Sequence, residues 1–230
     1  MVDIKGLTVV YPDGTTAVNN FTLSVGAGES VALAGANGAG KTTLMLAIVG
    51  VLRFNGEIMI DGIGLNKKTL GEIRKRAGLV FQNPDDQLFM PTVLEDIAFG
   101  PKNHGLTEAE ARLRAAETLE GLNAAYLIDK STLKLSGGEK RIAALAAVLA
   151  TRPSVMLFDE PTAFLDSKTR RVLMKLINGL PQTKIIASHD LDFLNETCGR
   201  AALMKDGGLY AEGEPRKLFD DEAAMSAADM

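Results

Sequence analysis

The segment from Gly35 to Thr42 reads GANGAGKT and fits the pattern G-x-x-x-x-G-K-[ST]. It follows the apolar run Val31-Ala32-Leu33-Ala34 and opens a helix that we predict from Lys41 to about Leu52. In this context the glycines let backbone N–H groups surround phosphate oxygens, Lys41 reaches the β- and γ-phosphates, and the Thr42 hydroxyl ligates Mg²⁺. A turn without a ligand is the less favoured interpretation, so we expect a site for ATP and Mg²⁺. Its expected nucleotide contacts are Gly35, Asn37, Gly38, Ala39, Gly40, Lys41, Thr42 and Thr43.

Two acidic residues end another apolar run. Val155 to Phe158 is a predicted buried strand that is followed by Asp159 and Glu160. Ligands bind at the carboxyl ends of strands in doubly wound sheets, so these carboxylates are expected beside the phosphates. Asp159 would hold Mg²⁺, and Glu160 would polarise the attacking water. Alone, such a pair is more often an ordinary exit from a strand; the glycine loop earlier in the chain reverses that judgement.

A second site for an anion is expected where LSGGEKR begins an apolar helix. Ser136 stands at the helix N-cap, and Gly137 and Gly138 permit an anion to approach closely. The alternative, a flexible helix start, is the better interpretation of Ser-Gly-Gly by itself. The complete string LSGGEKR favours a second site for an anion.

Taken together, GANGAGKT, LSGGEKR, VMLFDEP, FLD and SHD occur in the order found in ABC-type ATPases, which this chain resembles over nearly its whole length. The resemblance implies a head-to-tail dimer in which Ser136 and the glycines after it contact the γ-phosphate bound by another copy. It also implies that Asp166 connects the two sites. Two helix N-termini facing one triphosphate would hold it from both sides.

The resemblance assigns three further residues near the nucleotide. His189 matches the histidine that senses the γ-phosphate, and Gln82 matches the glutamine that joins Mg²⁺ and water to the helical subdomain. Tyr11 falls where the family stacks an aromatic ring on adenine, with Val18 flanking the base, although packing alone would also explain an aromatic residue there.

The elements that position these residues alternate between strand and helix. Short β-rich runs come first, and a βαβ rhythm returns after residue 136, so we predict an α/β fold with a mostly parallel sheet and an N-terminal antiparallel subdomain. Residues 83–135 have no strong strand and a helix from about Glu108 to Leu122 that is capped by Thr107. They are expected to form an inserted helical subdomain of a single ABC ATPase domain whose core is 1–82 and 136–230. The last eight residues, AAMSAADM, are expected to be frayed.

Composition limits the cellular setting. The chain has 230 residues, 46% of them hydrophobic, and a net charge of −4, which disfavours binding to nucleic acid through a basic surface. One cysteine, Cys198, and a start without an apolar leader favour the cytoplasm. No apolar run reaches the roughly 18 to 20 residues that span a bilayer. We expect the protein at the cytoplasmic face of the membrane as a peripheral subunit.

The segment FQNPDDQLFMPTVLEDIAFGP resembles the ATPases of energy-coupling-factor importers, especially those for cobalt and nickel. Glu139, in place of the common signature glutamine, is familiar in that group. The resemblance implies a transmembrane partner, a second ATPase subunit that is either identical or a paralogue, and a groove after Gln82 for a helix of the membrane partner. Docking and packing are equally favoured roles for Leu88, Phe89 and Met90. The cargo stays open among cobalt, nickel and a vitamin.

Two other function classes compete with an importer subunit. A soluble ABC ATPase that acts on nucleic acid or the ribosome is disfavoured, because the chain has one short uninterrupted cassette and an acidic balance. A regulatory module without catalysis is disfavoured, because Lys41, Asp159, Glu160 and His189 are all present.

Overall fold

The computed structural model describes all residues from Met1 to Met230, and they form two compact units. The first unit contains Met1–Leu79, Ser154–Glu160 and Pro181–Met230. The second contains Val80–Pro153 and Pro161–Leu180.

An antiparallel sheet opens the first unit, with the strand order β2-β1-β4-β5. Val2, Ile4, Leu7 and Val9 on β1 are all buried, although the step from Ile4 to Leu7 breaks a period of two. A register shift between Ile4 and Leu7 keeps both side chains on the buried face. The four strands are β1 (Val2–Val10), β2 (Thr16–Val25), β4 (Asn55–Ile60) and β5 (Ile63–Gly64).

The second sheet of this unit has the order β10-β9-β3-β8-β7-β6. Strand β3 pairs in parallel with both β8 and β9, and β7 pairs in parallel with β8, while β9 and β10 are antiparallel. Every residue of β7 and β8 is buried, as expected for parallel strands covered on both faces. The strands are β3 (Ser30–Gly35), β6 (Ala77–Val80), β7 (Val155–Asp159), β8 (Thr183–Ala187), β9 (Arg200–Lys205) and β10 (Gly208–Gly213). This strand order brings the carboxyl ends of β3, β8 and β7 to one edge.

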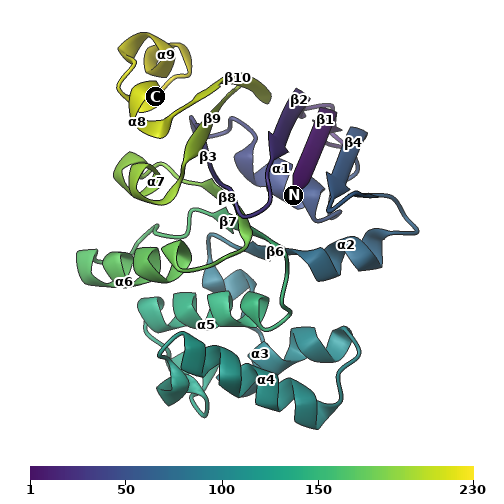
Figure 1. Ribbon diagram of the computed structural model, residues 1–230, viewed down its shortest axis with the longest axis vertical. Helices are drawn as coiled ribbons and strands as arrows, with labels where there is room; N and C mark the ends of the chain where they lie inside the picture. The colour runs from purple at the N-terminus through teal and green to yellow at the C-terminus, as the bar shows by residue number, and fades with distance from the viewer. The chain divides into compact units, whose positions relative to one another are not determined.

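Helix α1 (Lys41–Ile48) packs against strands of both sheets (Figure 1). Leu44, Met45 and Ile48 are completely buried and join the two sheets into one core. The helix ends earlier than the predicted Leu52, because Gly50 takes a φ of +66°. Helices α2 (Leu70–Arg76), α7 (Leu191–Thr197), α8 (Pro215–Phe219) and α9 (Glu222–Ala227) complete the unit.

The prediction of a frayed C-terminus was wrong. Asp221 caps α9 by accepting from the backbone N–H groups of Ala223 and Ala224. Met225 and Ala228 are buried. Two well-placed apolar side chains and a cap are enough to order this segment.

Four helices make up most of the second unit, and α3, α4 and α5 pack against one another (Figure 1). Capping boxes begin three of them, at Thr92, Thr107 and Ser136. The box at Thr107 confirms the predicted helix start, whereas α3 was not predicted. The helices are α3 (Val93–Asn103), α4 (Glu108–Gly121), α5 (Gly137–Leu149) and α6 (Ser167–Asn178), with 3-10 turns at Pro84–Asp86, Ala125–Leu127 and Thr132–Lys134.

The α/β class, the N-terminal antiparallel sheet and the mostly parallel second sheet agree with the sequence prediction. Residues 83–135 lie within the second unit, which also holds α5 and α6. The assignment of 1–82 and 136–230 to one core stays a prediction. No helix in the chain combines the length and the apolar character needed to cross a bilayer.

Candidate nucleotide site

The loop between β3 and α1 can be built only with glycine at two positions. A Cβ atom on Gly40, whose φ is +101°, would lie 2.1 Å from the carbonyl oxygen of Ala17. One on Gly35 would lie 2.5 Å from the carbonyl oxygen of Met204. Both obstacles are backbone atoms, so neither can move aside cheaply. The glycines therefore fix how the loop turns into the helix.

Lys41 begins α1 and is only 7% exposed. Its Nζ donates to the carbonyl oxygens of Gly35 at 2.6 Å and Ala36 at 3.0 Å. Burial lowers the pKa of Lys41, and the nearby carboxylates of Glu160 and Asp159 oppose that shift. The ammonium group is thus held against the inner side of the loop, where the pattern predicts phosphate.

Thr42 and Asp159 meet across the sheet edge. The Thr42 hydroxyl donates to Asp159 Oδ2 at 2.7 Å. Asp159 is 4% exposed, and burial raises its pKa, while the Thr42 hydrogen bond and the Lys41 charge act to lower it. The two predicted Mg²⁺ ligands from this unit are therefore neighbours.

Glu160 follows β7 with a φ of +46°, a conformation that costs energy for a residue other than glycine. Its Oε2 accepts from the Ser188 hydroxyl at 3.1 Å and from the His189 N–H at 3.2 Å. Its Oε1 is buried, has no hydrogen bond, and lies 3.4 Å from His189 Nε2. One oxygen of this carboxylate is thus anchored, and the other keeps its acceptor capacity.

Tyr11 stands beside the start of α1, where its hydroxyl forms a 2.9 Å hydrogen bond with the Thr43 hydroxyl. Its contact with adenine stays a prediction. Val18 has no exposed surface and belongs to the core of the antiparallel sheet, so its expected contact with the base was wrong. The pattern of β2 does not reveal this, because the step from Val18 to Phe21 breaks the alternation that Phe21 and Leu23 follow.

The second unit holds the start of α5. Ser136 is the exposed N-cap, and the Glu139 carboxylate accepts from the Ser136 N–H at 2.8 Å. A hydrogen bond from Lys130 at 2.6 Å is the largest of several contacts that lower the pKa of Glu139 to about 2. Gly137 faces open space, whereas a Cβ on Gly138 would lie 2.7 Å from Cγ2 of Thr169. Glycine at 138 is therefore needed for packing against α6.

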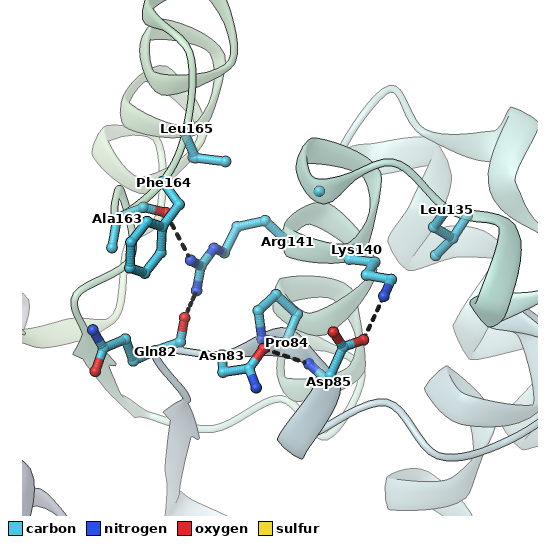
Figure 2. Close-up of a pocket in the computed structure, with 11 residues that line it drawn as sticks. Gln82, Asn83, Pro84, Asp85, Leu135, Lys140, Arg141, Ala163, Phe164 and Leu165 are labelled. Carbon is cyan, nitrogen blue, oxygen red and sulfur yellow. Dashed lines mark hydrogen bonds and ion pairs between the residues drawn. The ribbon is translucent and has the colours of Figure 1, made fainter.

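Asp166 and Gln82 also belong to the second unit. The Asp166 carboxylate caps α6 by accepting from Lys168 N, Thr169 N and the Thr169 hydroxyl, and these contacts lower its pKa. Gln82 is exposed after β6 and lines a hollow that Figure 2 shows. The approach of Gln82 to Thr42 and Asp159 stays a prediction.

The three residues proposed for docking differ in environment. Leu88 is buried, but Phe89 is 62% exposed and its ring meets that of Phe99 edge to face, with centroids 4.9 Å apart. The Asp96 carboxylate accepts from the N–H groups of Phe89 and Met90. The helix that carries Asp96 thereby fixes the loop that displays Phe89.

Sequence reasoning did not assign a role to three residues that bond to the predicted site residues or to the segments that carry them. Ser188, which is fully buried, anchors Glu160, and its place directly before His189 was the available signal. Lys130 pairs with Glu139, and Arg141 joins segments that are distant in sequence. Arg141 ends the motif LSGGEKR, although the motif does not show which segments it joins, and no local pattern pointed to Lys130.

Comparison with known proteins decides the family. Residues 18–163 match the family model for ABC transporters. A protein of Geobacter sulfurreducens that is named only as an ABC transporter ATP-binding protein is 45% identical over 98% of this chain and 91% of its own length. The chain belongs to the ABC transporter ATP-binding family. An energy-coupling factor transporter ATP-binding protein of Methanothermobacter thermautotrophicus is 42% identical over 100% of this chain and 76% of its own length.

Solved structures of ABC proteins share this fold. CbiO1 of Clostridium perfringens, part of the ABC transporter complex CbiONQ, matches with a TM-score of 0.85 and 35% identity over 99% of this chain and 94% of its own. A dimeric ATP-binding cassette in a post-hydrolysis state, bound to ADP and phosphate, matches with a TM-score of 0.83 and 30% identity over 94% of this chain and 99% of its own. The predicted ABC ATPase fold is confirmed, and the chain is an ATP-binding ABC ATPase.

Proposed function

We propose that this ABC ATPase energises a membrane importer of the energy-coupling-factor type, with cobalt or nickel ions as the cargo. The catalytic part of the proposal rests on one observation: four residues lie together at one sheet edge, namely Lys41, Thr42, Asp159 and Glu160. Relatives named for energy-coupling factors and for cobalt import support the transport part. The protein would be peripheral, at the cytoplasmic face of the membrane.

Lys41 would bind the β- and γ-phosphates. Its ammonium group already donates to two loop carbonyl oxygens, so binding a triphosphate exchanges neutral acceptors for charged ones, which form stronger hydrogen bonds. Tyr11 would lie against the adenine, since its hydroxyl bond to Thr43 fixes the ring beside the loop.

The residues present fit Mg²⁺, which prefers oxygen ligands. The Thr42 hydroxyl and the buried Asp159 carboxylate lie 2.7 Å apart and would hold the ion together with Gln82. Mg²⁺ neutralises charge on the β- and γ-phosphate oxygens.

Glu160 would orient and polarise the attacking water through Oε1, because Oε2 is occupied by Ser188 and His189. His189 Nε2 lies 3.4 Å from both Lys41 Nζ and Glu160 Oε1. From this position His189 would sense the γ-phosphate and orient Glu160. The backbone strain at Glu160 is consistent with a functional constraint.

A second copy, or a paralogue, would complete the site. Ser136, Gly137 and Gly138 at the start of α5 would contact the γ-phosphate bound by the other subunit, and Asp166 would connect the two sites. The exposed start of α5 supports this, because the dipole of a helix favours an anion at its N-terminus. The exposed Phe89 would dock on the transmembrane partner.

The test of this proposal uses Glu160→Gln protein with Mg-ATP. We expect a monomer without nucleotide and a dimer with ATP, measured by light scattering after size exclusion. Lys41→Ala should remain monomeric. The proposal fails if Glu160→Gln binds ATP, as measured by fluorescence of an ATP analogue, and yet stays monomeric.

Copurification tests the partner and the cargo. We expect the tagged chain, extracted from detergent-solubilised membranes, to bring a transmembrane protein with it, and cells that lack the chain to lose uptake of labelled cobalt or nickel. Recovery of the chain on RNA or DNA without a membrane protein would instead favour an ATPase acting on nucleic acid.

A further inference from the structure

Arg141 is a buried cation near the start of α5, and its side chain is bonded to two distant stretches of the chain. One guanidinium nitrogen, Nη1, donates to the carbonyl oxygens of Phe81 at 3.0 Å and Gln82 at 2.6 Å. The other, Nη2, donates to the carbonyl oxygen of Ala163 at 3.1 Å. Figure 2 shows the guanidinium group between these two backbones.

The charge of Arg141 has no acidic partner. The residue is 3% exposed, all its hydrogen bonds go to backbone carbonyl oxygens, and its Nε has no partner. A buried charge without a counter-ion is unfavourable, and carbonyl dipoles replace only part of the lost hydration. Burial accordingly lowers the pKa of Arg141. General packing would be served better by an apolar side chain, so the arrangement calls for a more specific explanation.

Both stretches that Arg141 holds carry proposed site residues. Gln82 lies on one, and Asp166 follows Ala163 by three residues on the other. Between them lies a hollow of about 320 Å³ (Figure 2). Phe164 borders it with a φ of +62° and is 97% exposed, so side-chain packing does little to hold this loop. Arg141 connects this loop, through one hydrogen bond to Ala163, with the Gln82 stretch, to which it makes two.

Helix α5 is tied to the Gln82 stretch a second time. The Gln87 side chain donates to the Ala144 carbonyl oxygen at 2.6 Å and accepts from the Phe81 N–H at 3.2 Å. Helix α5 therefore holds the Phe81 carbonyl oxygen directly, through Arg141, and the Phe81 N–H indirectly, through Gln87. A displacement of α5 would be transmitted to these residues, since a guanidinium fork fixes both distance and direction.

We propose that Arg141 is a positioning residue that couples the start of α5 to the Gln82 stretch and to the loop from Ala163 to Asp166. This inference rests on the proposed function. When a nucleotide binds at Ser136, Arg141 keeps the stretches that carry Gln82 and Asp166 in fixed positions relative to the start of α5. Arg141 itself touches no substrate.

A double-mutant cycle on the full chain tests the proposal. Arg141→Met keeps an unbranched apolar side chain like the aliphatic part of arginine and removes the fork. We expect it to lower the rate of phosphate release at saturating ATP by about 10- to 100-fold. Binding of a fluorescent ATP analogue should be unchanged, since Lys41 and Thr42 lie in the other unit. In the Gln82→Ala background, Arg141→Met should lower the rate of phosphate release by less than about a further twofold. Arg112→Gln, which removes an exposed arginine of the same unit, is the charge control.

The inference is overturned if Arg141→Met hydrolyses ATP at the wild-type rate. It is also overturned if Arg141→Met lowers turnover by the same factor in the Gln82→Ala background as in the wild type, because a structural role acts independently of Gln82. Should Arg141→Met fail to fold, Arg141→Lys enters the same cycle, since it keeps the charge with a single nitrogen. Failure of the proposed function would look different: Glu160→Gln would bind ATP and stay monomeric.

Discussion

Glu160 and His189 lie 3.4 Å apart, between Oε1 of the carboxylate and Nε2 of the ring, while the His189 backbone N–H holds the other carboxylate oxygen. The same residue thus fixes the orientation of Glu160 through its main chain and faces the free oxygen through its side chain. Any change at His189 that moves the turn after β8 will also move Glu160.

Glu160→Gln is expected to keep ATP binding and to slow turnover by roughly 10²- to 10⁴-fold, because an amide cannot accept a proton from water. Phosphate release and nucleotide binding measured on one sample separate the two effects. Glu214→Gln, an exposed change in the same unit, is the control. Unchanged turnover in Glu160→Gln would remove this residue from the role of base.

Glu139 should contribute to stability in a defined pH range. Its pKa is about 2 in the folded chain against an ordinary value of 4.5, chiefly because Lys130 donates to it. A lowered folded pKa stabilises the protein fully above pH 4.5, and the contribution is lost as the pH falls toward 2. Glu139→Gln should therefore unfold with a weaker pH dependence between pH 4.5 and 2, as measured by urea denaturation.

Glu110→Gln is the matched control for that experiment, because Glu110 occupies the same place in a capping box on α4 and has no lysine partner. Glu110→Gln should change the pH dependence of unfolding between pH 4.5 and 2 less than Glu139→Gln does. Equal effects would mean that capping, and not Lys130, stabilises the Glu139 carboxylate.

Gly138→Ala should lower the free energy of unfolding by about 1 to 2 kcal/mol, because the new methyl group would lie 2.7 Å from Cγ2 of Thr169. Thr169→Ser deletes that methyl group and retains the hydroxyl that donates to Asp166. The double variant with Gly138→Ala and Thr169→Ser should regain most of the lost free energy of unfolding, as measured by denaturant unfolding. If it does not, the two helices are not in contact at this point.

Phe89→Ala should reduce recovery of the transmembrane partner by about tenfold, as expected for an exposed aromatic residue that becomes buried on binding. Leu113→Ala is the matched control, since both side chains are 62% exposed and belong to the second unit. The ratio of the two chains is measured after extraction in detergent. Equal recovery for the two variants would place docking elsewhere.

Local patterns in the sequence predicted the elements with strong local determinants. The glycine loop, the strand before Asp159 and the capping box at Thr107 each have signals within a few residues, and each was found. Helix α3 was missed although Thr92 and Glu95 form the same capping box, because Gly100 and Pro101 near its end weaken the helical pattern.

Contacts between distant segments could not be predicted. The three bonds of Arg141 span from 22 to 60 residues, and the place of Val18 depends on which face of β2 meets the core. In the same way, the apolar content of the last residues looked too small to order them, yet Met225 and Ala228 are buried. Such outcomes depend on tertiary packing, which a window of neighbouring residues does not contain.

The contact of Gly40 with the Ala17 carbonyl has a mechanical consequence. With the backbone of β2 packed directly against the glycine loop, the loop and the antiparallel sheet have no room to slide past each other. A displacement of β2 at Ala17 would therefore displace the glycine loop as well, and Lys41 with it.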